Sequence, residues 1–172
     1  MLGLAWSIGL MLACGIVKPA VAGDLERFIE LNRCPIVERL KLINETSFPG
    51  MSDRFIIVAV EGGGQRYVQC LFLDDDASLL CEASSGWHGP AEGEAGHLRL
   101  AAAQVEALGR LGFDTTVTEG NYQRIVDLFG EEPFAKVADD LLTALYWSYG
   151  AWSGTALRIV APLAPEISPD AC

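Results

Sequence analysis

The stretch that decides the fold runs from residue 54 to residue 72 and reads RFIIVAVEGGGQRYVQCLF. Two apolar runs of strand length flank three consecutive glycines, Gly62 to Gly64. A phosphate-binding glycine loop needs a helix N-terminus after it to supply amide donors, whereas a strand is predicted here. Glycine also adopts the positive φ angles that tight hairpin turns require. We therefore expect two strands, over 54–60 and 66–73, joined by a glycine turn.

The hydrophobic pattern of the remaining chain predicts a third strand over 78–83, which completes a meander. A strand is also expected in the tail, over 155–161. The region 113–130 is ambiguous: 114–118 fits a short edge strand, and 122–129 fits either a strand or a helical turn. Helices are expected over 25–43 with an interruption near Pro35, over 98–111 and over 132–149.

Every residue of the strand over 55–60 is apolar, so both of its faces need cover. The predicted fold class is α+β, an antiparallel sheet of three to five strands with helices packed on one face. Three candidates remain for the other face. They are the tail strand around Leu157 and Ile159, a second copy of the chain in a homodimer, and a segment of a polypeptide client.

The N-terminus has the pattern of a signal peptide. An apolar run over 4–17 precedes Ala20-Val21-Ala22, which predicts cleavage before Gly23 and a periplasmic or secreted bacterial protein. Lipidation at Cys14 is the weaker alternative. The run is too short for a stable membrane span, so none is expected after cleavage. The predicted organisation is a signal peptide over 1–22, a single domain over 23–161 and a C-terminal tail over 162–172.

The chain is acidic, with 23 Asp and Glu residues against 12 Lys and Arg residues and a net charge of -11. Removal of the leader also removes Lys18 and makes the charge more negative. Nucleic acids and anionic lipids repel such a surface, so neither is expected as a partner.

Four cysteines remain after the predicted cleavage, and an oxidising compartment predicts disulfides. If residues 75–76 form a two-residue hairpin loop, Cys70 faces Cys81 within bonding range. That register places them at a hydrogen-bonded pair, which a bulge or a longer loop would adjust. Cys34 and Cys172 would then tie the two ends of the chain, although four cysteines allow three pairings in all.

No motif in the chain predicts catalysis, and no cofactor is expected. His88 and His97 flank a Gly-rich loop but lack a recognised zinc spacing, and Asp74–Asp76 lack the spaced ligands of a calcium loop. The sequence also has no Gly-x-Ser-x-Gly elbow and no Cys-x-x-Cys. We expect a protein that is not an enzyme; the alternative is a small metal-dependent hydrolase centred on His88, His97 and Glu82.

Trp147 is unusual in the helix over 132–149. The apolar side chains of this helix form one stripe, whereas Trp147 points the opposite way, among Lys136 and Asp140. A large aromatic residue on a polar face indicates either cover by the tail strand or a second subunit, or a partner-binding role.

Four segments, RFIIVAVEGGGQRYVQCLF, LLCEASSG, LRLAAAQVEALGRLGF and GNYQRIV, together resemble the TY-Chap family, the YbjN-related domains that are similar to type III secretion chaperones. The matching motifs are Arg66-Tyr67-Val68-Gln69, Leu111-Gly112-Phe113 and Asn121-Tyr122. The resemblance covers about residues 24–150. It implies an α+β sandwich and a non-enzymatic, chaperone-like or adaptor role.

The resemblance favours a client or a second copy on the uncovered sheet face. We expect an exported protein that binds a partner polypeptide, and a self-associating structural envelope protein is the alternative. The predicted partner-binding residues are Phe55, Ile57, Tyr67, Gln69 and Trp147.

Overall fold

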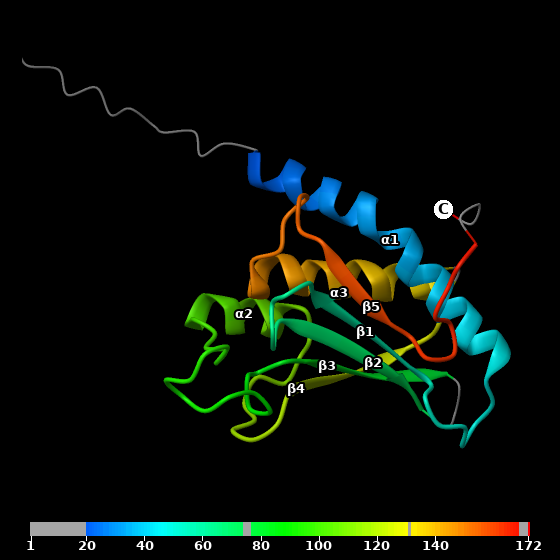
Figure 1. The fold of residues 1–172 in the computed structure, drawn as a ribbon. Coiled ribbons are helices and arrows are strands. Elements are labelled where there is room, and N and C mark those ends of the chain that lie inside the picture. Colours follow the sequence, from blue (N-terminus) through cyan, green and yellow to red (C-terminus); the bar gives the residue numbers. More distant parts are fainter. Residues whose placement is uncertain (1–19, 74–76, 131, 169–171) are drawn as a thin grey trace, which may run out of the picture.

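The computed structural model describes residues 20–73, 77–130, 132–168 and 172. The predicted leader run over 4–17, Cys14 and the acidic loop Asp74–Asp76 lie outside the described residues. The elements follow one another along the chain as shown in Figure 1: α1 (Ala20–Thr46), β1 (Phe55–Val60), β2 (Tyr67–Phe72), β3 (Ser78–Ala83), α2 (Ala102–Arg110), β4 (Tyr122–Asp127), α3 (Pro133–Tyr149) and β5 (Leu157–Val160).

The strands form one antiparallel sheet of five strands in the order β4-β3-β2-β1-β5. The helices lie on one side of this sheet (Figure 1). The predicted α+β class, with helices on one face of an antiparallel sheet, is therefore confirmed. The tail strand β5 pairs with β1 and forms an edge of the sheet. Leu157 and Ile159 pack against the core on the helix side, so the tail strand does not cover the opposite face.

The three glycines turn the hairpin between β1 and β2, as predicted. Gly62 and Gly64 have φ angles of 69° and 60°, in the left-handed region that glycine adopts without strain. The backbone N–H of Gly63 donates to the carbonyl oxygen of Val60 at 2.9 Å. The N–H of Val60 donates to the carbonyl oxygen of Arg66, also at 2.9 Å. These bonds close the turn and start the antiparallel pairing.

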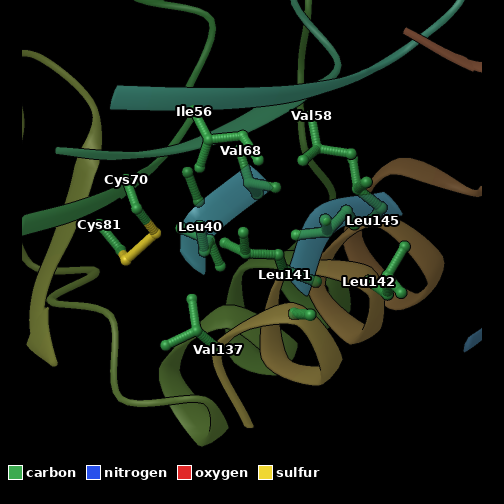
Figure 2. Packing of buried hydrophobic residues seen from close by; sticks show 14 of the residues in the cluster. Leu40, Ile56, Val58, Val68, Cys70, Cys81, Val137, Leu141, Leu142 and Leu145 are labelled. Carbon is green, nitrogen blue, oxygen red and sulfur yellow. A yellow bond between two sulfur atoms is a disulfide. The ribbon is translucent and has the colours of Figure 1, made fainter. Parts of the chain in front are cut away.

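The core lies between the sheet and the helices. Ile56, Val58 and Val68 are fully buried and point from the sheet toward Leu141 and Leu145 of α3 (Figure 2). Full burial of one such side chain stabilises the fold by about 1.5–3 kcal/mol. The strands and α3 therefore hold each other in place mainly through apolar contact.

Helix α1 passes through Pro35 without a break, so the predicted interruption is wrong. Proline removes one backbone donor and crowds the preceding turn, which normally kinks or ends a helix. Here Phe28 before the proline, and Ile36 and Leu40 after it, are fully buried. Phe28 also contacts the ring of Tyr146 of α3, with ring centroids 6.2 Å apart. Packing on both sides of Pro35 thus keeps the two halves in one helix.

The ambiguous region contains β4, so the strand alternative for 122–129 is correct. An isolated bridge links Asp114 to Gln123 of β4. On the helix side, the Arg124 guanidinium forms an ion pair with Asp140 at 3.1 Å and lies 4.8 Å from the ring centre of Phe113. The Nε atom of Arg124 is buried without a hydrogen-bond partner among the described residues. Arg124 thereby joins an edge strand to α3.

Two disulfides join cysteines of the described residues, Cys70–Cys81 and Cys34–Cys172. Cys70 faces Cys81 in the predicted register, with their Cα atoms 4.0 Å apart. The N–H of Leu73 donates to the carbonyl oxygen of Ser78, which makes these two residues a hydrogen-bonded pair. Hydrogen-bonded and non-hydrogen-bonded pairs alternate along an antiparallel ladder, so Cys70 and Cys81 form a non-hydrogen-bonded pair. The prediction that they form a hydrogen-bonded pair is therefore wrong. Two disulfides are consistent with an oxidising environment.

The C-terminal segment runs back along α1 (Figure 1). Ala164 is fully buried, and Nη2 of Arg39 on α1 donates to the Pro165 carbonyl oxygen at 3.2 Å. The Cys34–Cys172 disulfide also joins this segment to α1. Residues 162–168 of the predicted tail therefore contribute to the core and lie on the helix side of the sheet.

Candidate binding surface on the open face of the sheet

One face of the sheet carries no helix among the described residues, and we call it the open face. Adjacent residues of a strand point to opposite faces. Since Ile56, Val58 and Val68 are buried beneath the helices, their neighbours point the other way. The paired registers then give the strand residues of the open face: Phe55, Ile57, Ala59, Tyr67, Gln69, Leu71, Ser78, Leu80, Glu82, Gln123, Ile125, Asp127, Arg158 and Val160.

Four apolar side chains form a continuous line across the open face, which we call the apolar row. Phe55 pairs with Leu71, Leu71 with Leu80, and Leu80 with Ile125, so the row crosses β1, β2, β3 and β4. Leu71 is 42% exposed and Ile125 is 58% exposed. A contiguous exposed apolar patch is typical of an interaction surface.

A polar row lies next to the apolar row and consists of Gln69, Glu82 and Gln123. Nε2 of Gln69 donates to one carboxylate oxygen of Glu82, and Nε2 of Gln123 donates to the other at 2.7 Å. Both donors are uncharged amides. No ion pair to Glu82 is present among the described residues. Glu82 is therefore oriented by hydrogen bonds while its charge has no cationic partner in this part of the chain.

The two rows border a shallow hollow of about 280 Å³. Phe55, Ile57 and Gln69, three of the predicted partner-binding residues, line it together with Leu80 and Glu82. The hollow thus combines apolar walls with one carboxylate. This arrangement suits recognition of an apolar side chain next to a polar or charged group.

Tyr67 lies on the same face but has a structural contact. It is half-buried, and its hydroxyl oxygen accepts a hydrogen bond from Nδ2 of Asn121 at 3.1 Å. Asn121 directly precedes β4, so this bond ties the start of β2 to the start of β4. Tyr67 is outside the lining of the hollow.

Trp147 lies on α3 and therefore on the helix side, away from the other four predicted residues. It is 47% exposed and contacts Tyr146 edge to face, with centroids 5.1 Å apart. It lines a groove of about 410 Å³ between α2 and α3. The other walls of this groove include Ala103 of α2 and Leu111, the residue that follows α2. The tail strand does not line this groove. The predicted residues consequently fall on two separate surfaces.

The β4 edge of the open face is partly closed by Asp114. Its N–H donates to the Gln123 carbonyl at 2.8 Å. The Asp114 carboxylate accepts hydrogen bonds from the hydroxyl of Thr116 at 2.7 Å and from its N–H at 2.9 Å. These two bonds stabilise the charged form and hold the pKa of Asp114 below its usual value.

The histidines lie elsewhere. His97 lines a broad cavity of about 730 Å³ beside the Gly-rich loop, and its Nδ1 is 2.8 Å from the Pro90 carbonyl oxygen. His88 is exposed. Within the described parts of the chain, no group of three or more His, Cys, Asp or Glu residues is arranged to hold a metal ion.

Several residues of the surface were not singled out from the sequence. Leu71, Leu80, Gln123 and Ile125 are among them, and Glu82 appeared only in the hydrolase alternative. The register inferred for Cys70 and Cys81 already placed Leu71 opposite Leu80 and Gln69 opposite Glu82. The position of β4 was the missing information.

Across the described residues, none of the helices combines the length and the apolar character that crossing a membrane requires. Comparison with known proteins gives no match to this chain, whether against family models, curated proteins or solved structures.

Proposed function

We propose that the protein is a non-catalytic, chaperone-like or adaptor protein that binds a partner polypeptide through the open face. The apolar row carries this proposal. Its four side chains lie on four adjacent strands, while the helices and the C-terminal segment pack on the other side. A contiguous apolar patch that is exposed to water is unfavourable unless a partner covers it.

The proposed location is the periplasm of a bacterium or the secreted fraction. The predicted signal peptide over 1–22 supports export. The Cys34–Cys172 and Cys70–Cys81 disulfides support an oxidising compartment.

A distant relationship to the TY-Chap and YbjN-related domains is part of the proposal. Its support is the resemblance of the quoted segments, together with an element order of helix, three strands, helix, strand and helix. The chain adds β5 and the disulfide-linked segment after that order. By analogy, this relationship supports a chaperone-like role.

Site-specific photo-crosslinking tests the proposal. A photoreactive amino acid replaces Ile125 on the open face in one variant and Leu31 on α1 in a matched control. The two side chains have similar exposure, 58% and 55%. We expect an adduct with another polypeptide from position 125 in the envelope of the native host, and none from position 31.

The mass of the adduct separates the alternatives. An adduct of twice the chain mass would support the self-associating envelope protein instead. Absence of any adduct at Ile125, or equal adducts at both positions, would reject the open face as a binding surface.

A further inference from the structure

The charge of the open face gives information about the chemistry of its partner. Among the described residues that line the hollow, Glu82 is the only charged one. Its two oxygens accept hydrogen bonds from amides, which fix the carboxylate without neutralising it. A carboxylate beside apolar walls interacts more strongly with a cation than one in open water, because the local dielectric constant is lower.

The charges around Glu82 also favour a cationic partner. Among the strand residues of the open face, Glu82 and Asp127 are acidic and Arg158 is basic. Arg158 lies on β5, at the opposite edge of the sheet from β4. The chain as a whole has a net charge of -11. Such a field attracts basic segments and accelerates their association.

The same charges disfavour a second copy of this chain as the occupant. A two-fold axis through the open face would bring identical surfaces together. The open face carries two acidic strand residues, Glu82 and Asp127, against one basic residue, Arg158, so two copies would bring together surfaces of the same net charge. Like charges at an interface suppress association, so an oppositely charged partner fits this face better.

We infer that the open face binds a polypeptide segment that combines apolar side chains with an adjacent Lys or Arg. The apolar side chains cover the apolar row, and the cation pairs with Glu82 one row away. Three strand spacings of about 4.8 Å make the row about 14 Å long, which four or five extended residues span. This inference rests on the proposed function and specifies the partner chemistry for the same surface.

Selection from a random peptide display library tests the inference. The bait is the full mature chain, and the matched variants are Glu82→Gln on the open face and Glu106→Gln, which removes the same charge from the exposed surface of α2. We expect the wild type and Glu106→Gln to enrich peptides with Lys or Arg next to apolar residues. We expect Glu82→Gln to lose that preference for a basic residue.

Binding of one selected peptide provides the quantitative test. Fluorescence anisotropy is expected to give a Kd roughly fivefold to tenfold weaker for Glu82→Gln, and less than about twofold weaker for Glu106→Gln. Added salt is expected to weaken wild-type binding and to affect Glu82→Gln less. The salt series uses wild-type protein, so it remains informative if Glu82→Gln folds poorly.

Other results would overturn the inference. These are no enrichment, enrichment without basic residues, enrichment unchanged by Glu82→Gln, or peptides that match this chain itself. If Ile125 still crosslinks to a polypeptide in the host, the proposed function stands and only the partner chemistry is wrong. If Ile125 gives no adduct, the proposed function has failed independently.

Discussion

Removal of the Cys34–Cys172 disulfide is expected to destabilise the protein strongly, although the bond lies outside the densest part of the core. Cys172 is exposed and Cys34 is half-buried, so Cys34→Ala with Cys172→Ala removes little packing. The two residues are 138 positions apart. A crosslink over that distance lowers the entropy of the unfolded chain, and its loss is worth about 5 kcal/mol in the loop-closure model.

This magnitude can be compared with the second disulfide. Cys70 and Cys81 are 11 positions apart, for which the same model gives about 3 kcal/mol. Both cysteines are fully buried, so their replacement by alanine also removes packing contacts. Only the Cys34–Cys172 variant therefore isolates the effect on the unfolded chain.

The assay is urea denaturation followed by circular dichroism, after mass spectrometry with and without reductant has counted the bridges. The unfolding free energy is expected to fall by roughly 3–5 kcal/mol and the m-value to rise, because the uncrosslinked denatured chain expands and exposes more surface. A loss below about 1 kcal/mol with an unchanged m-value would refute this reasoning. It would show that the crosslink does not act through the unfolded chain.

Replacement of the half-buried Arg124 by methionine is expected to cost roughly 1–3 kcal/mol in urea denaturation, because it breaks the ion pair to α3 and leaves Asp140 with Lys136 as its remaining partner. Lysine at this position is expected to restore less than half of the unfolding free energy that methionine loses. Full restoration would contradict a role for the planar guanidinium. Tyr149→Phe removes a 2.6 Å hydrogen bond to a backbone carbonyl and is expected to cost about 1–2 kcal/mol. Burial also raises the pKa of Tyr149, so alkaline absorbance titration should show it ionising only with unfolding. The pKa of Asp114 is lower in the folded than in the unfolded protein, so its ionised carboxylate stabilises the fold at any pH above the unfolded-state pKa. This stabilisation is lost as the pH falls through the folded-state pKa. NMR titration of Thr116→Ala is expected to show that pKa moving up, and no movement would exclude the hydroxyl as a cause.

Much of the fold could be predicted from local patterns. The apolar runs around Gly62–Gly64 predicted the central hairpin, since strand alternation and turn chemistry depend on neighbouring residues. Counting along the chain also placed Cys70 opposite Cys81. The helix through Pro35 could not be predicted in this way, because contacts between α1 and α3 outweigh the local effect of proline.

The candidate site was only partly predictable for a related reason. Phe55, Ile57 and Gln69 lie together because alternation along β1 and β2 is visible in the sequence. Trp147 lies on a separate surface because α3 packs on the helix side of the sheet, and this packing is a tertiary property. The side chain of Ile125 completes the apolar row only because β4 pairs with β3, a long-range contact that local patterns do not encode.

The pairing of β5 with β1 also has a consequence for biosynthesis. Val60 pairs with Leu157, a residue that the ribosome adds almost 100 positions later, which takes roughly 5–20 s at typical synthesis rates. During that interval one edge of an entirely apolar strand lacks its neighbour. An open apolar edge readily pairs with other chains. The nascent protein would therefore depend on a holding factor, or on export before folding, until its final strand is available.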